Sequence, residues 1–106
     1  MTLDVINVSR YADVVIRSFA DKDTEKLWQR RPVRRLQAIE RAARRKLDMV
    51  NAAAILSDLA VPPGNRLEPL RGDRTGQHSI RINDQYRVCF RWTDAGPEDV
   101  EICDYH

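Results

Sequence analysis

The order of the sequence patterns predicts an α+β domain, with two N-terminal helices packed against a small antiparallel β-sheet from the second half. From about residue 33 to residue 59 apolar residues recur every three or four positions, whereas beyond Pro62-Pro63-Gly64 they alternate with polar residues. The chain has 106 residues, of which 42% are hydrophobic, and few are Gly or Pro. One modest core is therefore expected, without help from a metal or a disulfide.

The first 14 residues show no clear apolar period and are interpreted as an N-terminal extension (1–14) before a domain that spans 15–106. The start of the chain carries an acid early and lacks a basic region followed by a long apolar stretch, so it does not resemble a secretory signal. No apolar run approaches the roughly 18 residues of a membrane span. A cytoplasmic protein that does not enter a membrane is expected.

The first elements of the domain are expected to be a strand and a short helix. Residues 14–19 are rich in β-branched side chains, which favours a strand. Asp21 or Asp23 then supplies a helix N-cap, and Pro32 ends this helix or begins the next.

A long second helix is predicted from about Val33 to Leu59. Its apolar residues follow alternating steps of three and four, which places them on one stripe. The members of the stripe are Leu36, Ile39, Ala43, Leu47, Val50 and Ala54.

The remaining elements are strands. Residues 79–82 and 86–92 alternate on either side of a turn at 83–85, and residues 100–103 form a final strand. Within 86–92 the aromatic and apolar side chains share one face, while Arg87 and Arg91 share the other. We expect the apolar face to pack against the helices and the basic face to point outward.

Charge is distributed unevenly, although the net charge is only +2. Residues 26–46 hold nine basic residues and one acid, and residues 94–106 hold five acids and no Lys or Arg. Such asymmetry suggests a surface for a polyanion, with a solvated helix face as the alternative. Cys89 and Cys103 are expected to be free thiols, and no Cys/His spacing suits zinc.

Two segments carry candidate chemistry. Residues 65–87 contain five arginines, and guanidinium groups on a sheet can hold phosphates and stabilise a pentavalent phosphorane, although an exposed arginine ladder also occurs as a solvated face. The chain ends on Asp104-Tyr105-His106, where the imidazole can transfer a proton and the phenol can stack on a base. The five arginines are Arg66, Arg71, Arg74, Arg81 and Arg87.

The run from Pro62 to Arg87, together with the Asp-Tyr-His end, resembles the HigB family of toxin–antitoxin toxins, within the RelE/ParE fold group. The resemblance implies a RelE-like fold and a ribosome-dependent endoribonuclease that needs no metal or cofactor, in which the RNA 2′-hydroxyl attacks the adjacent phosphate. It implies catalytic roles for His106, Asp104, Tyr105, Arg87 and Arg71. Some members have His where this chain has Glu68; Glu68 is a further candidate catalytic residue, as an auxiliary base, and the assignment of the general base stays open.

The resemblance also implies partners. These are the ribosome, mRNA and a HigA-like helix-turn-helix antitoxin. The toxin is expected to contact operator DNA only as part of its complex with this antitoxin. RNA or ribosome contacts are expected from basic residues of the sheet and the long helix: Arg66, Arg74, Arg81, Arg41, Arg44 and Arg45. Two alternatives remain on the same fold, a ParE-like inhibitor of DNA gyrase and a non-catalytic module that binds RNA or the antitoxin.

Overall fold

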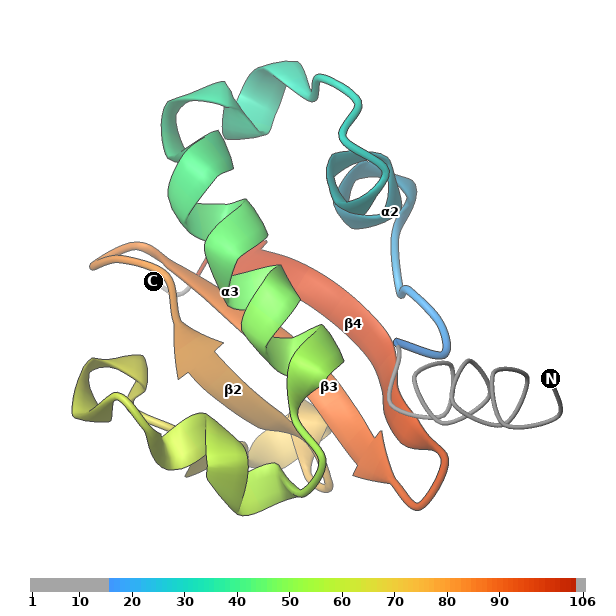
Figure 1. Cartoon of the computed structure of the whole chain (residues 1–106), viewed down its shortest axis with the longest axis vertical. Helices are drawn as coiled ribbons and strands as arrows, with labels where there is room; N and C mark the ends of the chain where they lie inside the picture. The colour runs from blue at the N-terminus through green and yellow to red at the C-terminus, as the bar shows by residue number, and fades with distance from the viewer. Residues whose placement is uncertain (1–15, 105–106) are drawn as a thin grey trace, which may run out of the picture.

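The computed structural model describes residues 16–104, and these form the predicted α+β fold. A four-stranded antiparallel sheet has the order β1-β2-β3-β4, and α3 crosses one of its faces (Figure 1). The proposed extension 1–14 lies outside the described residues. Among the described helices none is long and apolar enough to cross a membrane.

The predicted first strand is wrong over its described part. Residues 16–18 have no regular structure, and Phe19 forms only an isolated parallel bridge to Val100. The segment follows β4 through few bonds, such as Arg17 N to Pro97 O at 2.8 Å. The pairing with β4 stops because the chain continues into a helix. From this helix, Thr24 Oγ1 accepts a 3.0 Å hydrogen bond from the Ile102 N–H, so a side chain covers this edge of β4.

The first helix, α2 (Lys22–Trp28), begins at Asp21, whose carboxylate accepts from Thr24 N at 3.2 Å. This resolves the choice between the two possible caps. Asp23 instead accepts a 2.6 Å bond from Arg35 Nε, which ties α2 to the segment that follows.

The single helix predicted from Val33 to Leu59 is wrong, because the segment is divided into η1 (Arg34–Ile39), α3 (Glu40–Ala52) and η2 (Leu56–Ala60). Ala53 is extended, and the Asp58 carboxylate accepts from the amides of Ala54 and Ile55 at 2.9 and 3.2 Å. A side chain that accepts hydrogen bonds from nearby amides competes with the backbone bonds that would continue the helix. The helix therefore ends here, although the apolar residues of the sequence keep their helical spacing. The stripe is still buried at Leu36, Ala43, Leu47 and Val50, whereas Ala54 is exposed.

The predicted meander is present as β2 (His78–Arg81), β3 (Tyr86–Thr93) and β4 (Gly96–Asp104), and β4 is longer than expected. The two-residue strand β1 (Glu68–Pro69), which pairs with β2, was not predicted. Val88 and Phe90 lie in the core, and Tyr86 and Trp92 pack against it, as the alternation predicted.

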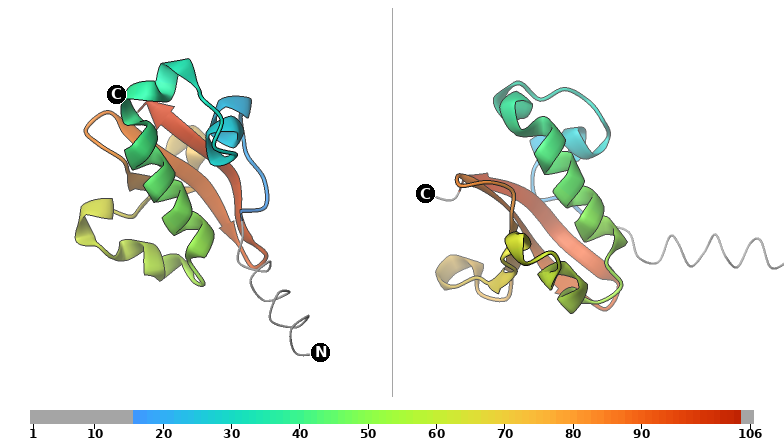
Figure 2. Two further views of the ribbon diagram at one scale, coloured as in Figure 1. Left: turned by 45° about the horizontal axis from the view of Figure 1, so that its top comes forward. Right: turned by 60° about the vertical axis from the view of Figure 1, so that its left-hand side comes forward.

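The opposite face of the sheet is not the open basic surface that the sequence suggested. Figure 2 shows α3 on one face of the sheet and η4 (Gly72–Arg74) on the other. Arg74 reaches across this second face to bond Glu101 of β4 at 3.1 Å. Because this segment folds back over the sheet, Arg87 is only 6% exposed and Cys89 1%.

Candidate functional site

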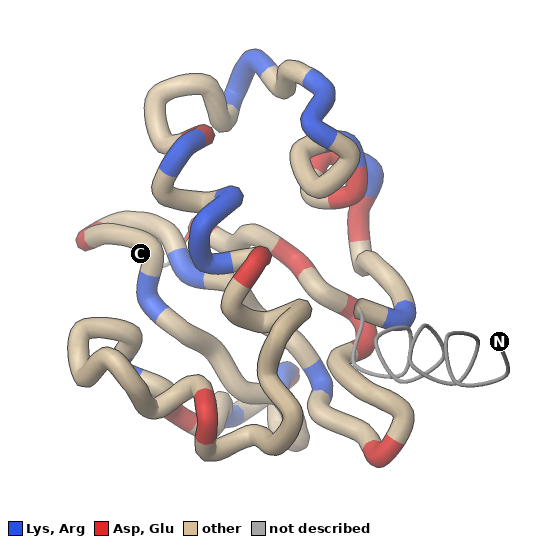
Figure 3. The backbone as a smooth tube through the Cα atoms, in the orientation of Figure 1, with Lys and Arg blue, Asp and Glu red and all other residues tan. Residues whose placement is uncertain are grey.

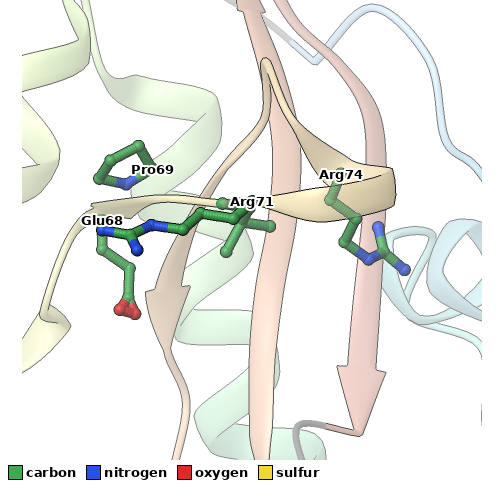
Figure 4. A pocket seen from close by; sticks show the side chains of 5 residues that line it. Glu68, Pro69, Arg71 and Arg74 are labelled. Atoms are coloured by element: carbon green, nitrogen blue, oxygen red, sulfur yellow. The ribbon is translucent and has the colours of Figure 1, made fainter.

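The face of the sheet opposite α3 gathers several of the predicted residues. The register aligns Glu68 with Ser79, Ser79 with Cys89, and Cys89 with Glu101, so these four side chains lie in one row across the sheet. Next to β1 lies a pocket of about 470 Å³, lined by Glu68, Pro69, Leu70, Arg71 and Arg74 (Figure 4). The site is therefore open to solvent on one side and backed by the sheet on the other.

Arg71 is the exposed cation of this pocket. Within residues 16–104 its guanidinium forms no ion pair or hydrogen bond with another side chain. A guanidinium without a carboxylate partner keeps its donors for an incoming anion, and its planar fork matches two phosphate oxygens.

Arg87 lies beneath the pocket and is held on several sides. Its Nε donates to Ser79 Oγ at 2.7 Å, and its Nη2 donates to the Arg66 carbonyl at 2.7 Å. The same Nη2 lies 3.7 Å from Glu68 Oε1. The side chain is 8% exposed, so the charge of Arg87 acts from within the protein wall.

Arg74 is committed to the sheet through Glu101 and also bonds Gln77 at 3.1 Å. Burial lowers its pKa, but the hydrogen bond to Glu101 and the nearby thiols outweigh burial and raise the pKa overall. Arg74 is a permanent cation that closes one side of the pocket.

The two cysteines are free, with Cys89 buried and Cys103 partly exposed. A hydrogen bond between the thiols, followed by burial, raises the pKa of Cys103, so this thiol stays protonated at neutral pH. The described residues contain no group of three or more His, Cys, Asp or Glu that could hold a metal ion.

Of the three predicted C-terminal residues, Asp104 lies within the described part of the chain. Asp104 is exposed, lies opposite Tyr86 in the register, and accepts a 3.0 Å bond from Gln85 Nε2. Strand alternation places Asp104 on the face of Tyr86, away from the row that contains Glu68. Among the described residues the structure therefore does not bring Asp104 into the pocket, and Tyr105 and His106 lie outside the described residues.

The predicted basic helix has two kinds of arginine. Arg41 and Arg45 are exposed and form no ion pair within the described range, whereas Arg44 donates to the Leu27 and Arg31 carbonyls and to Glu40 at 2.9 Å. Arg44 thus fastens the end of α2 to α3. Figure 3 shows basic positions along η1 and α3, and acidic positions on β4.

Lys46 extends this basic surface toward the sheet, and the sequence reasoning did not single it out. Its Nζ donates to the fully buried Asn65 at 2.6 Å. Burial, and then the positive charges of Arg45 and Arg81, lower the pKa of Lys46. Arg81 also pairs with Asp84, and Arg66 is exposed.

Sequence reasoning also missed Ser79 and Asn65, the buried polar partners of Arg87 and Lys46. The alternation of the strand at Ser79 placed it on the face of Arg81. Only the register between β2 and β3 brings it to Arg87, and a single sequence does not specify that register.

Comparison with known proteins agrees with the fold and identifies the family. The model of the family described as RelE-like toxin of type II toxin-antitoxin system HigB matches residues 17–106. Toxin HigB-1 of Vibrio cholerae serotype O1 is 46% identical over 79 residues, which are 73% of this chain and 83% of that protein.

Two solved structures from Staphylococcus aureus share the fold. The YoeB–YefM complex has a TM-score of 0.56 at 19% identity, covering 88% of this chain and 97% of the matched chain. The YoeB dimer has a TM-score of 0.55 at 21% identity, covering 90% and 99%. Together with the family match over most of its length, these findings show that the chain belongs to the HigB-like family of RelE-like toxins of type II toxin–antitoxin systems.

Proposed function

We propose that this toxin is an endoribonuclease that cuts mRNA on the ribosome, without a metal or cofactor. The observation that carries the proposal is the pocket beside β1, where Arg71 is exposed and unpaired within the described residues, Arg74 closes one side and Glu68 supplies a carboxylate. A concave site with two guanidinium groups and one carboxylate suits a phosphodiester that gains negative charge during reaction.

In the proposed reaction the RNA 2′-oxygen forms a bond to the adjacent phosphorus, and the bond from phosphorus to the 5′-oxygen breaks. The 2′-hydroxyl loses a proton to a base, and the leaving 5′-oxygen gains a proton from an acid. Arg71 stabilises the phosphorane directly, and Arg87 adds positive charge from beneath the pocket wall.

The proton-transfer roles are extended from the family resemblance. His106 and Asp104 exchange protons with the RNA, Tyr105 stacks on or orients a nucleotide, and Glu68 is an auxiliary base. Glu68 is supported by its place in the pocket and by its 42% exposed side chain. Asp104 has weaker support, because it lies on the other side of its strand from that pocket.

Ribosomal RNA is proposed to meet α3 and the adjacent sheet through phosphate contacts, which do not depend on sequence. Arg41 and Arg45 have free access to such contacts, and Arg44 contributes less because it is bonded to α2. The smaller contributors are Arg66, Arg74 and Arg81.

The proposed protein partner is a HigA-like antitoxin, which neutralises the toxin and joins it to operator DNA. The solved neighbour YoeB, with the same fold, is described in complex with YefM. The proposed place of action is the cytoplasm, where translating ribosomes are found. Residues 15–106 are proposed as the toxin domain and 1–14 as an extension that the reaction does not need.

The proposal is tested by incubating the purified chain with ribosomes that hold a defined mRNA, and with the same mRNA alone. We expect new 5′ ends only in the mRNA on the ribosome. Intact mRNA in both samples, with loss of DNA supercoiling by gyrase in a parallel assay, would instead support a ParE-like inhibitor. Ribosome binding without cleavage would support the non-catalytic module.

A further inference from the structure

A buried hydroxyl lies directly behind the proposed site, and no role has been assigned to it. Ser79 is fully buried in β2, and its Oγ accepts the Arg87 Nε–H at 2.7 Å. Within the described residues this is the bond that its side chain forms. Losing this bond would leave a buried polar group without a hydrogen-bond partner, which has a high free-energy cost. The position of the hydroxyl therefore constrains the orientation of the Arg87 guanidinium.

The guanidinium group transmits this constraint because it is planar and rigid. With Nε fixed at Ser79, the Nη2 atom is directed to the Arg66 carbonyl at 2.7 Å and toward Glu68 at 3.7 Å. One plane thus links β2 and β3 to the segment that enters β1. The Ser79 hydroxyl is one of the groups that hold that plane, and it is the one bonded to Nε.

The segment around Arg66, whose carbonyl accepts the bond from Arg87, has little regular structure to fix its position. Arg66 has a φ of 48°, a left-handed backbone conformation that residues other than glycine rarely adopt. Glu68 follows two residues later and begins the two-residue strand β1, which has only two paired positions with β2. A short strand after a strained residue depends on side-chain bonds for its position, and the bond from Arg87 to the Arg66 carbonyl supplies one.

We infer that Ser79 is a positioning residue for the proposed cleavage: its hydroxyl orients Arg87, and Arg87 then holds Glu68 and the wall of the pocket in place. The inference deepens the proposed function and rests on it. Ser79 does not touch the RNA. Replacing it with alanine removes the Ser79 acceptor of the Arg87 Nε–H, so the guanidinium is held less firmly in the orientation that faces Glu68.

The first test compares single-turnover cleavage of ribosome-bound mRNA by the parent, Ser79→Ala and Ser79→Thr, each checked for folding by urea denaturation. Ser79→Ala should cleave about tenfold to a hundredfold more slowly, as expected for a small displacement of reacting groups. The ribosome concentration for half-saturation should change little, because the main proposed ribosome contacts, Arg41 and Arg45, lie on α3 and not on β2. Ser79→Thr keeps the hydroxyl and should recover most of the rate.

The matched control is Thr93→Val. Thr93 Oγ1 donates to Gly96 O at 2.7 Å and accepts from Ala95 N at 3.1 Å, in the turn between β3 and β4. Its removal also deletes hydroxyl hydrogen bonds, but at a place that does not line the pocket. Thr93→Val should lose stability and keep the parental cleavage rate for its folded fraction.

A double-mutant cycle with Arg87→Lys separates positioning from a general loss of packing, since residues that act through one group are not additive. Ser79→Ala combined with Arg87→Lys should be no slower than Arg87→Lys alone. A further loss of cleavage rate in the double variant, or a parental rate in folded Ser79→Ala, overturns the role of Ser79. In either case the nuclease proposal still stands, provided that the parent cleaves the mRNA. A parent that never cleaves ribosome-bound mRNA overturns the nuclease proposal and, with it, the role of Ser79.

Discussion

At the scale of single residues, the structure divides the predicted arginines by their freedom to bind a phosphate. Arg87 is bonded to Ser79 and to the Arg66 carbonyl, and Arg74 is bonded to Glu101. Arg71 is exposed in the pocket and forms no side-chain ion pair within residues 16–104. The pattern of arginines alone does not distinguish these three residues by burial, because burial and cross-strand bonding arise only from the folded sheet.

The first prediction therefore concerns Arg71. Arg71→Ala should slow cleavage of ribosome-bound mRNA by about a hundredfold or more, as expected when a donor to a developing oxyanion is lost. Its free energy of unfolding should stay within about 0.5 kcal/mol of the parent, since the side chain removed is exposed and forms no ion pair with the described residues. Rates and urea denaturation are measured on the same samples.

Arg91→Ala is the matched control, since Arg91 is also exposed and lies on β3, but it does not line the pocket. Its only ion pair within the described residues is a 3.7 Å contact with Asp99. An Arg71→Ala variant as active as Arg91→Ala would remove Arg71 from the reaction.

The second prediction concerns His106, which the family resemblance places in proton transfer. His106→Ala should slow cleavage by roughly a hundredfold to ten-thousandfold, as for loss of a general acid or base. His106→Gln should be almost as slow, because an amide forms hydrogen bonds but does not shuttle a proton. Parental cleavage by both variants would transfer the role to Glu68 or to another group.

At the scale of elements, the sequence predicts what depends on periodicity and misses what depends on local competition. The alternating run over β3 gives the correct core face, because strand side chains alternate wherever the strand lies. The helix from Val33 to Leu59 fails because the Asp58 carboxylate binds the amides of Ala54 and Ile55, which ends α3 without disturbing the apolar spacing. The strand β1 escapes prediction because two residues show no period.

The site follows the same pattern. The segment that carries Glu68 and Arg71 is predicted from its arginines and its resemblance, and these two residues do line one pocket. The covering of this sheet face by η4 depends on the bond from Arg74 to Glu101. These two residues are 27 positions apart, so no local sequence pattern predicts the contact.

The third prediction is made for α3, where two arginines are exposed and one is structural. Replacing Arg41 and Arg45 with Glu should weaken ribosome binding and reduce its salt dependence by about one unit of slope per lost phosphate contact. Arg44→Ala should instead lower the free energy of unfolding by about 1 kcal/mol, since it removes bonds to the Leu27 and Arg31 carbonyls. Filter binding at several salt concentrations and urea denaturation measure the two effects.

Both variants are compared with Arg34→Glu on η1, an exposed arginine outside α3 and without an ion pair in the described range. If Arg41 and Arg45 can be reversed in charge with no larger effect than Arg34, the α3 surface does not meet the ribosome. It would then be a solvated face or part of the surface for the antitoxin.

At the scale of the whole molecule, one sheet separates two kinds of surface. The face under α2 and α3 is the hydrophobic core, whereas the other face holds the arginine-lined pocket. The cations of α3 reach the end of this sheet through Lys46 and Arg81. These cations would attract a polyanion that runs from the helix surface toward the sheet, as the proposed action on ribosome-bound RNA requires.

In the proposed reaction the RNA itself supplies the nucleophile, and the ends of the cut mRNA report this directly. Attack by the 2′-oxygen leaves a 2′,3′-cyclic phosphate on the upstream fragment and a 5′-hydroxyl on the downstream fragment, and needs no metal in the site. The measurement is mass spectrometry of both fragments after cleavage on programmed ribosomes, with the magnesium that holds the ribosome together supplied throughout. We expect the cyclic phosphate and the 5′-hydroxyl, whereas a 3′-hydroxyl paired with a 5′-phosphate would show that the 2′-oxygen is not the nucleophile.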